Sequence, residues 1–314
     1  MKRLLAALAL IACLPVAQAA GFDYRLAPRQ IAPDTWVLEG AQEDFSFANG
    51  GRIVNTAFVV TDAGVVVIDS GPSRQYGEQT VAAIARATDK PIIKVWITHH
   101  HPDHFLGNQA FATRTLGALE RTISDIAAEG KAFNENMYRL VGDAMRNTEV
   151  AVPTEALVPG IVEIGGHRFE LLALDGHTAG DLAVFDHSTG VLFAGDLVFH
   201  DRTPTTPHAT IARWLKSLDV LAALPFKQLV PGHGPVAADA GPIRQTRDYL
   251  KWLDALLTQS AAAGLDMTEV MRLPLPKVFR QMAVIDAEFP RSVSHLFPAA
   301  EEAALNTTSS HAKH

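Results

Sequence analysis

Residues Ile92–His104 read IIKVWITHHHPDH, and this stretch decides the fold. Its first half is an apolar, β-branched run of the kind found in strands that are buried on both faces. Its second half contains four histidines, a proline and an aspartate within His99–His104. Such polar groups are costly to bury alone, and divalent metal ions bind imidazole and carboxylate groups well. The stretch therefore predicts a metal site at the carboxyl end of a buried strand.

The residues before this stretch predict a βαβ unit. Asn55–Val60 and Val65–Asp69 are β-rich runs joined by a turn at Thr61–Gly64, which is a hairpin signal. Gln75–Thr88 has its apolar residues at helical spacing and leads into a strand at Ile92–Thr98. The order strand, helix, strand indicates an α/β protein whose sheet contains parallel pairs.

The residues after the histidine cluster alternate between helices and hairpins. Residues 119–149 have a helical pattern, which we interpret as either a lid or a helical insertion. Two hairpins are expected within Ile161–Leu174 and Leu182–Ala194. A helix at Thr210–Leu224 and a short strand at Lys227–Val230 follow.

The first twenty residues have the pattern of a secretory signal peptide. Lys2 and Arg3 precede the apolar run Leu4–Leu14, and Ala17-Gln18-Ala19 forms a small-x-small cleavage signal. The pattern predicts a periplasmic or secreted protein. The alternative is a lipoprotein anchored at Cys13, because Leu10-Ile11-Ala12-Cys13 resembles a lipobox. Cys13 is the one cysteine in the sequence, so a soluble form cleaved after it has no thiol for a disulfide, a metal ligand or a nucleophile.

Charge argues against a nucleic-acid partner. The chain has 27 lysines and arginines against 34 aspartates and glutamates, with a formal net charge of −7. Phosphate binding requires a basic face, which this balance does not favour. We therefore expect a small-molecule substrate.

The spacing of the histidines in the cluster indicates which of them can bind a metal. His99 and His101 lie two residues apart in an extended loop, so their side chains leave on the same side. His100 points the other way and is expected to support the site without binding the metal. Asp103 and His104 lie at the start of the next helix, where a turn can direct them to a second point nearby.

Three later fragments each place a candidate ligand after a predicted strand. They are Leu174-Asp175-Gly176-His177, Phe193-Ala194-Gly195-Asp196 and Val230-Pro231-Gly232-His233. Taken singly, each has an ordinary reading as a loop histidine, a capping aspartate or a turn residue. Together with the cluster at Ile92–His104, they predict one shared site.

This order of motifs resembles that of the metallo-β-lactamase-fold hydrolases. The resemblance covers roughly Asn55–Pro235 and implies a four-layer αββα sandwich with the site along one edge of two sheets. It also implies that one metal is held by His99, His101 and His177, that the other is held by Asp103, His104 and His233, and that Asp196 bridges both. Asp69 matches the aspartate that supports the ligands from behind in this family.

With this resemblance, the chain divides into four segments. Residues 1–20 are expected to form the leader, and residues 21–240 the catalytic domain of the metallo-β-lactamase fold. An irregular arm is expected at Ala20–Pro33, where the leader ends and the domain begins. Residues 241–305 form a helical C-terminal extension that packs on the same domain. Residues 306–314 form a flexible tail.

Finer features resemble a subgroup, the quinoprotein relay system zinc metallohydrolases. The resembling fragments are Glu43-Asp44-Phe45, Asn49-Gly50-Gly51, Asn55-Thr56, Gly71-Pro72-Ser73 and Phe289–His295. This resemblance implies a functional link to a periplasmic quinoprotein dehydrogenase.

The ligand set predicts a reaction type. Two divalent ions about 3.5–4 Å apart can share a water and lower its pKa to about 7, which gives a bridging hydroxide at neutral pH. We expect this hydroxide to attack an ester, thioester, lactone or amide, with Asp103 as ligand and catalytic orienting group. Zinc is the expected metal, with iron or manganese as alternatives. Asp196 stands where β-lactamases of the family usually have cysteine or serine, which disfavours a dedicated β-lactamase and leaves promiscuous β-lactamase activity open.

Two other functions are compatible with the sequence. One is a non-hydrolytic metal-binding accessory protein of the periplasm, and the other is a mononuclear iron oxygenase acting on sulfur compounds. His200, Arg202 and His208 are expected to bind substrate, because their loop follows Asp196 closely. His295 is a candidate to fold back over the site from the helical tail.

His167 is expected at the surface, in a hairpin beside Gly165-Gly166.

Overall fold

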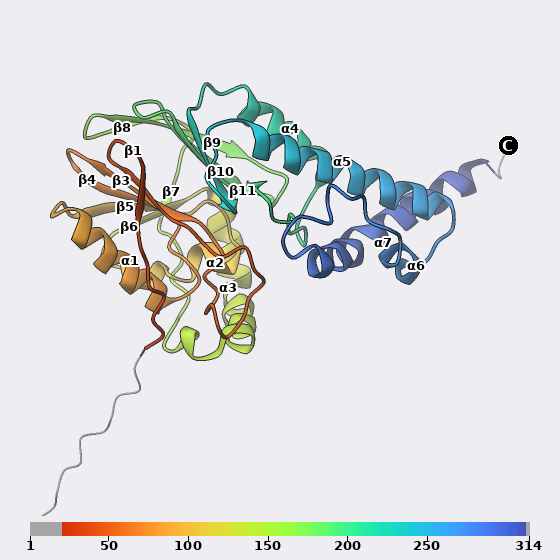
Figure 1. Ribbon diagram of the computed structural model, residues 1–314, viewed down its shortest axis with the longest axis horizontal. Helices are drawn as coiled ribbons and strands as arrows, with labels where there is room; N and C mark the ends of the chain where they lie inside the picture. The colour runs from red at the N-terminus through yellow and green to blue at the C-terminus, as the bar shows by residue number, and fades with distance from the viewer. Residues whose placement is uncertain (1–20, 312–314) are drawn as a thin grey trace, which may run out of the picture.

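The computed structural model describes residues 21–311. The expected leader, with Cys13, lies outside the described residues, as do residues 312–314. The described part is a sandwich of two sheets with helices on both outer faces, and its C-terminal helices project beyond the sandwich (Figure 1). Among the described helices, none is both long and apolar enough to cross a membrane.

The first sheet carries the opening stretch near its centre. Its seven strands are ordered β1-β2-β3-β4-β5-β6-β7. They are β1 (Arg29–Ala32), β2 (Thr35–Leu38), β3 (Thr56–Thr61), β4 (Gly64–Ile68), β5 (Ile92–Trp96), β6 (Thr115–Ala118) and β7 (Glu155–Ala156). β3 and β4 form the expected hairpin, and β4 pairs with β5 in parallel with Val67 opposite Val95. The predicted βαβ unit is therefore confirmed.

The second sheet contains both later hairpins. Its strands are ordered β12-β11-β10-β9-β8, and they are antiparallel except for the parallel pair β11 and β12. They are β8 (Gly160–Ile164), β9 (His167–Leu174), β10 (Asp181–Asp186), β11 (Val191–Phe199) and β12 (Gln228–His233).

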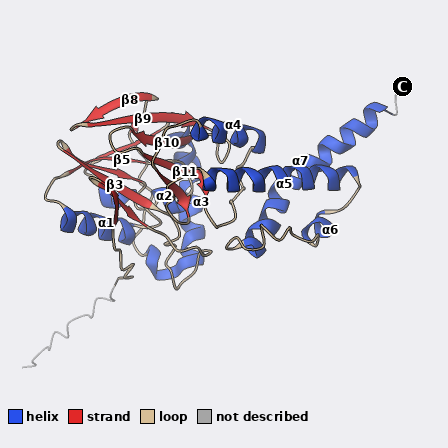
Figure 2. Ribbon diagram, turned by 45° about the horizontal axis from the view of Figure 1, so that its top comes forward, coloured by secondary structure: helices blue, strands red, loops and turns tan. Residues whose placement is uncertain are grey.

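Helices cover the outer face of each sheet (Figure 2). The helices of the described residues are α1 (Arg74–Ala87), α2 (Pro102–Phe105), α3 (Glu120–Val141), α4 (Ile211–Ala222), α5 (Gly241–Ala262), α6 (Met267–Met271) and α7 (Ile285–His311), with short 3-10 turns at η1 (Asn108–Phe111) and η2 (Gly142–Met145). Ser73 caps α1 by accepting a hydrogen bond from the backbone of Tyr76. Asp266 and Glu269 form a capping box that starts α6.

Three apolar clusters separate four layers. Val66, Trp96 and Phe193 belong to the cluster between the sheets. Val67 packs in a second cluster with residues of α1 and α3, and Trp214 of α4 packs in a third, with α5, α6 and α7. Val66 and Val67, neighbours in β4, thus pack in different apolar clusters, because successive side chains of a strand point to opposite faces of the sheet. The predicted αββα sandwich with a C-terminal helical extension is confirmed.

Several local predictions were incomplete. The arm Ala20–Pro33 contains strand β1, and the short strands β6 and β7 were missed because each has few β-branched residues. The helix expected over residues 119–149 ends at Val141, where Gly142 adopts a positive φ of 61°. At the other end of the chain, α7 continues to His311, so the polar C-terminal segment is helical up to that residue.

Candidate metal centre

The structure brings all seven predicted ligands together at one edge of the sandwich. Each has at most 6% of its surface exposed. His99 and His101 follow β5, and Asp103 and His104 lie in α2. His177 follows β9, Asp196 lies in β11, and His233 ends β12. The carboxyl end of β5 therefore meets the loops and strand ends of the second sheet.

One group comprises His99, His101, His177 and Asp196, whose donor atoms lie within 4.8 Å of one another. His177 Nε2 and His101 Nδ1 are 2.9 Å apart. Asp196 Oδ2 lies 3.4 Å from His177 Nε2 and 3.8 Å from His99 Nε2. Three imidazoles and a carboxylate are a donor set that suits zinc.

The second group comprises Asp103, His104 and His233, again within 4.8 Å. Asp103 Oδ2 lies 3.3 Å from His233 Nε2 and 3.8 Å from His104 Nε2.

Asp196 lies between the two groups. Its Oδ1 is 3.1 Å from His104 Nε2, and its Oδ2 is 3.2 Å from His233 Nε2. The residue does not end a strand, as the sequence suggested, but lies inside β11 where the pairing with β12 shifts register on either side of Gly195. Such irregularities re-aim side chains next to active sites. The position is the one that a bridging ligand would require.

Outer partners fix which nitrogen of most imidazoles faces the site. His104 Nδ1 lies 2.8 Å from Asp69 Oδ2, and His233 Nδ1 lies 2.8 Å from the Ile53 carbonyl. His99 Nδ1 lies 3.1 Å from Thr98 Oγ1. With Nδ1 occupied, Nε2 is left for a metal, which is the usual arrangement behind metal-binding histidines.

Asp69 lies behind the candidate ligands and contacts Thr98 and His104. It accepts hydrogen bonds from Thr98 N at 2.8 Å and Thr98 Oγ1 at 2.9 Å, in addition to its contact with His104. Its φ of 60° is unusual for a residue other than glycine, but aspartate tolerates this region better than most residues.

Buried donor atoms without a hydrogen-bond partner indicate whether the seven candidate ligands could hold metal ions. His99 Nε2, His104 Nε2, Asp103 Oδ2 and Asp196 Oδ1 are buried and have no hydrogen-bond partner within the described part of the chain. Buried polar atoms are normally satisfied, so four such atoms in one cluster indicate a missing partner. Divalent cations fit, because every one of these atoms can donate a lone pair.

Electrostatics also favour a cation. Burial lowers the pKa of His99 and His101 well below the usual value and lowers that of His177 to about 3, which keeps these rings neutral. Burial would also lower the pKa of His104, but the carboxylates of Asp196, Asp69 and Asp103 raise it well above its usual value. Burial opposes ionisation of Asp196, yet His233 and His104 hold its pKa well below the usual range. His99, His101 and His177 thus present neutral rings to the ionised Asp196 carboxylate, whereas the carboxylates around His104 favour a positive charge at that point.

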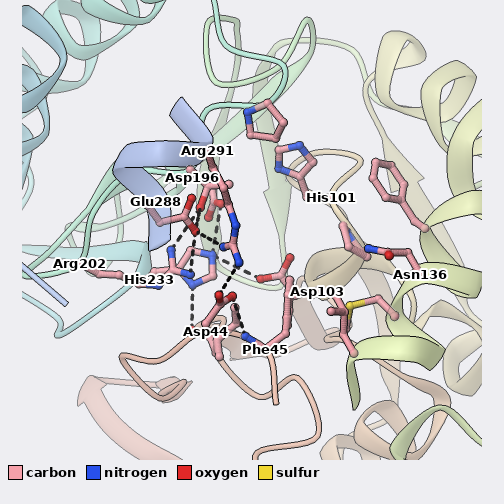
Figure 3. A pocket seen from close by; sticks show the side chains of 17 residues that line it. Asp44, Phe45, His101, Asp103, Asn136, Asp196, Arg202, His233, Glu288 and Arg291 are labelled. Atoms are coloured by element: carbon pink, nitrogen blue, oxygen red, sulfur yellow. Dashed lines mark hydrogen bonds and ion pairs between the residues drawn. The ribbon is translucent and has the colours of Figure 1, made fainter. Parts of the chain in front are cut away.

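A cavity of ≈ 350 Å³ opens over the second group. Its floor includes His101, Asp103, Asp196 and His233, and α3 forms one wall (Figure 3). That wall presents Phe133, Asn136, Met137 and Leu140. The opposite wall is charged and presents Asp44, Arg202, Glu288 and Arg291.

The three predicted substrate residues have different positions. Arg202 lines the cavity, is 2% exposed and lies 3.7 Å from Glu288 Oε1. His208 does not line it but contacts His101, with 2.9 Å between His208 Nδ1 and His101 Nε2. His200 also lies outside the lining, and its Nδ1 is 2.7 Å from the Pro235 carbonyl.

Two other histidines were also discussed from sequence. His295 of α7 is exposed and does not line the cavity. The expectation that His167 lies at the surface was wrong, because its ring is buried and its Nδ1 lies 2.8 Å from Asp186 Oδ2. That carboxylate also accepts from Thr189, so the pair closes the β10–β11 turn.

Sequence reasoning missed most of the cavity walls. Asp44 and Arg291 are 247 positions apart in the chain but form an ion pair. No local sequence pattern predicts a contact between such distant residues. Phe133 and Met137 of α3 lie four residues apart on one helical face, a spacing that would have marked them as neighbours but not as cavity residues.

Comparison with known proteins agrees with this architecture. The family model described as the metallo-beta-lactamase superfamily matches residues 49–233. Hydroxyacylglutathione hydrolase of Rhodobacter capsulatus is 31% identical over 173 residues, which cover 51% of this chain and 59% of the relative. Linear primary-alkylsulfatase of a Pseudomonas species is 21% identical over 260 residues, which cover 67% of this chain and 48% of the relative. The chain thus spans about half the length of these two relatives.

Solved structures share the fold. A metallo-beta-lactamase from Pontibacter korlensis superposes with a TM-score of 0.59 at 22% identity, covering 72% of this chain and 99% of that one. The metallo-beta-lactamase FIM-1 from Pseudomonas aeruginosa, solved in a mono-zinc form, gives a TM-score of 0.58 at 17% identity, covering 72% and 95%. Since the family model covers more than half of the sequence, the chain belongs to the metallo-beta-lactamase superfamily and carries a His/Asp metal-binding site of the metallohydrolase kind.

Proposed function

We propose that this protein is a dinuclear metal-dependent hydrolase that cleaves an ester, thioester, lactone or amide bond. The observation that carries the proposal is the position of Asp196, whose two oxygens lie 3.1 Å from His104 Nε2 and 3.2 Å from His233 Nε2, with His177 Nε2 at 3.4 Å. When bound, two ions at such a site would supply Lewis acidity and an acidified water.

The residues of the chain would hold the ions, orient the attacking water and contact the substrate. His99, His101 and His177 would hold one ion, Asp103, His104 and His233 the other, and Asp196 both. Asp103 also lines the cavity, so its carboxylate can orient the attacking water and accept its proton. The apolar wall of α3 would exclude water from the substrate, and Arg202 would contact a polar substrate group.

Among carbonyl substrates, we favour esters and thioesters over β-lactams. Asp196 in place of cysteine or serine supports this preference. So does the similarity to hydroxyacylglutathione hydrolase of Rhodobacter capsulatus, at higher identity than to the type 2 metallo-beta-lactamase of a Bacillus species, which is 23% identical. Promiscuous β-lactamase activity is compatible with the site.

We further propose zinc as the metal, export to the periplasm or beyond, and a functional link to a quinoprotein dehydrogenase. Zinc is supported by the donor set and by the mono-zinc form of the FIM-1 enzyme. Export is supported by the leader pattern of residues 1–20, with anchoring at Cys13 as the alternative. The dehydrogenase link is supported by the sequence fragments around Asp44 and Arg291, which pair in the structure.

Purified protein assayed for metal content and for hydrolysis of ester, thioester, lactone and β-lactam panels would test the proposal. We expect at least two ions per chain and ester or thioester turnover that Asp103→Asn reduces at least a hundredfold. One iron per chain with oxygen consumption would instead establish the mononuclear oxygenase. Two zinc ions without turnover would establish the accessory role.

A further inference from the structure

His100 is a buried histidine that the dinuclear site does not use. It is 3% exposed, and both ring nitrogens are buried without a hydrogen-bond partner among the described residues. An imidazole in this situation loses the hydration of both nitrogens and gains no direct replacement. The ring therefore requires a partner that the surrounding chain does not provide at hydrogen-bonding distance.

Two side chains from separate elements approach this ring. Glu129 of α3 places Oε2 3.8 Å from His100 Nε2. His208, from the loop between β11 and α4, places Nε2 3.7 Å from the same oxygen. The centroids of the two imidazole rings are 4.9 Å apart. Glu129 Oε2 thus lies near an imidazole nitrogen of both rings, which come from two other segments.

These distances are close to those that a metal requires. Ligands about 2.0–2.2 Å from a tetrahedral zinc ion lie about 3.3–3.6 Å from one another. The observed 3.7 and 3.8 Å would close to that range with small side-chain movements. Direct contact between the donors would need a further contraction to about 2.9 Å.

An outer contact orients the His208 ring, and a carboxylate lies near His100 beyond hydrogen-bonding distance. His208 Nδ1 lies 2.9 Å from His101 Nε2, which directs His208 Nε2 toward Glu129. Asp125 Oδ2 lies 4.0 Å from His100 Nδ1 and is itself held by Arg121 at 2.8 Å. A carboxylate behind a ligating histidine is a common feature of zinc sites.

We propose that His100, His208 and Glu129 form a third divalent-metal site, which binds zinc or a similar ion beside the dinuclear centre. The side chains of Glu129 and His208 are 46% and 35% exposed, which gives an ion access from solvent and leaves room for water as the fourth ligand. The site would fasten α3 to the loop that follows β11.

Metal counting on the full-length protein tests this proposal independently of any hydrolytic activity. Equilibrium dialysis against a series of free Zn²⁺ concentrations, followed by elemental analysis, should show three ions per chain, the third binding more weakly. Glu129→Gln and His208→Gln should each bind two. Glu135→Gln, which removes an exposed glutamate from the same helix, is the matched control and should bind three.

Substitution with Co²⁺ adds a spectroscopic readout. The third equivalent should add a visible absorption band that Glu129→Gln lacks, and because Glu129 is half exposed, this variant should fold normally. Saturation of the wild type at two ions, or a third ion that persists in both variants, would refute the proposal. Asp196→Ala separates the two proposals: one remaining ion that is lost in Asp196→Ala/Glu129→Gln would support both, whereas a wild type that binds one ion, kept in Asp196→Ala and lost in Glu129→Gln, would support the third site and refute the dinuclear centre.

Discussion

Gly232→Ala should disable the metal centre without removing any ligand. Gly232 precedes His233 in β12, and a Cβ at this position would overlap Asp196 Oδ1. It would also lie 2.8 Å from the Gly195 carbonyl carbon and 2.9 Å from Asp196 N, inside the roughly 3.5 Å at which such atoms pack. The backbone at Gly232 does not have a positive φ, so the effect is steric and not conformational.

The size of the effect follows from the surroundings of Asp196. Relief of the overlap requires the carboxylate to move by about 1 Å, and four histidines lie within 3.8 Å of its oxygens. Overpacking of this kind costs about 1–3 kcal/mol of unfolding free energy. A misplacement of about 1 Å at a catalytic centre can cost about a hundredfold in rate, so the loss of activity should exceed the loss of stability.

Elemental analysis and chemical denaturation, each with and without chelator, measure the two effects separately. The variant should lose at least one ion per chain and should be destabilised by about 1–3 kcal/mol in the chelated form. Gly241→Ala is the control, because its Cβ would meet only the Asp239 and Arg244 side chains. Retention of both ions at wild-type affinity in Gly232→Ala would refute the position assigned to Asp196.

Four further predictions concern the ligands, their supports and the cavity wall. Asp196→Ala should lose both ions, as measured by elemental analysis, and retention of two ions with a normal rate would contradict a bridging role. Asp69→Ala leaves Thr98 N, Thr98 Oγ1 and His104 Nδ1 without their acceptor. Chemical denaturation should therefore show a loss of about 3–5 kcal/mol of unfolding free energy, and metal affinity should fall about 10–100-fold. Asp69→Asn, which keeps an acceptor oxygen, should retain more of the stability and more of the metal affinity. Glu288→Ala removes the carboxylate that faces the buried Arg202 guanidinium and should lower the unfolding free energy by about 3–5 kcal/mol. Arg291→Ala, at the half-exposed end of the same wall, should lower it by about 1 kcal/mol or less. Equal losses in the two variants would argue against a buried ion pair. In the chelated protein, burial lowers the pKa of His100 to about 4 and that of His177 to about 3, so the unfolded chain binds more protons than the folded chain below pH about 6.5. Stability should therefore decrease from pH 6.5 toward 4, by about 3 kcal/mol for His100 alone, and a flat profile would show that these rings are not desolvated. His104, whose pKa is raised, adds a stabilisation that is lost only as pH rises above about 6.5.

The sequence predicted the sandwich and the grouping of the ligands because both depend on local patterns. A buried strand such as Ile92–Trp96 has a readable apolar run, and each candidate ligand follows such a run closely. Since the carboxyl ends of strands converge at a sheet edge, position along the chain translates directly into position in space. The roles of the seven residues as ligands remain predictions.

Other features depend on contacts that no local pattern encodes. His167 was placed at the surface because its hairpin composition is typical of exposed turns, but Asp186, nineteen residues later, pairs with it inside the fold. The contact of His208 with His101, 107 residues away in the chain, was not predicted, and a role of His208 in substrate binding stays a prediction. Both features involve polar side chains whose partner is decided by packing and not by spacing.

The cavity combines a floor that lies inside the family match with a wall whose residues lie largely outside it. The family match spans residues 49–233, which contain all seven candidate ligands. Asp44, Glu288 and Arg291 lie outside that span, yet they form the charged wall opposite α3. They also brace one another, since Arg291 contacts both carboxylates and Glu288 faces the buried Arg202. Substrate preference should therefore follow the segment before β3 and helix α7, whereas the type of chemistry should follow the matched core.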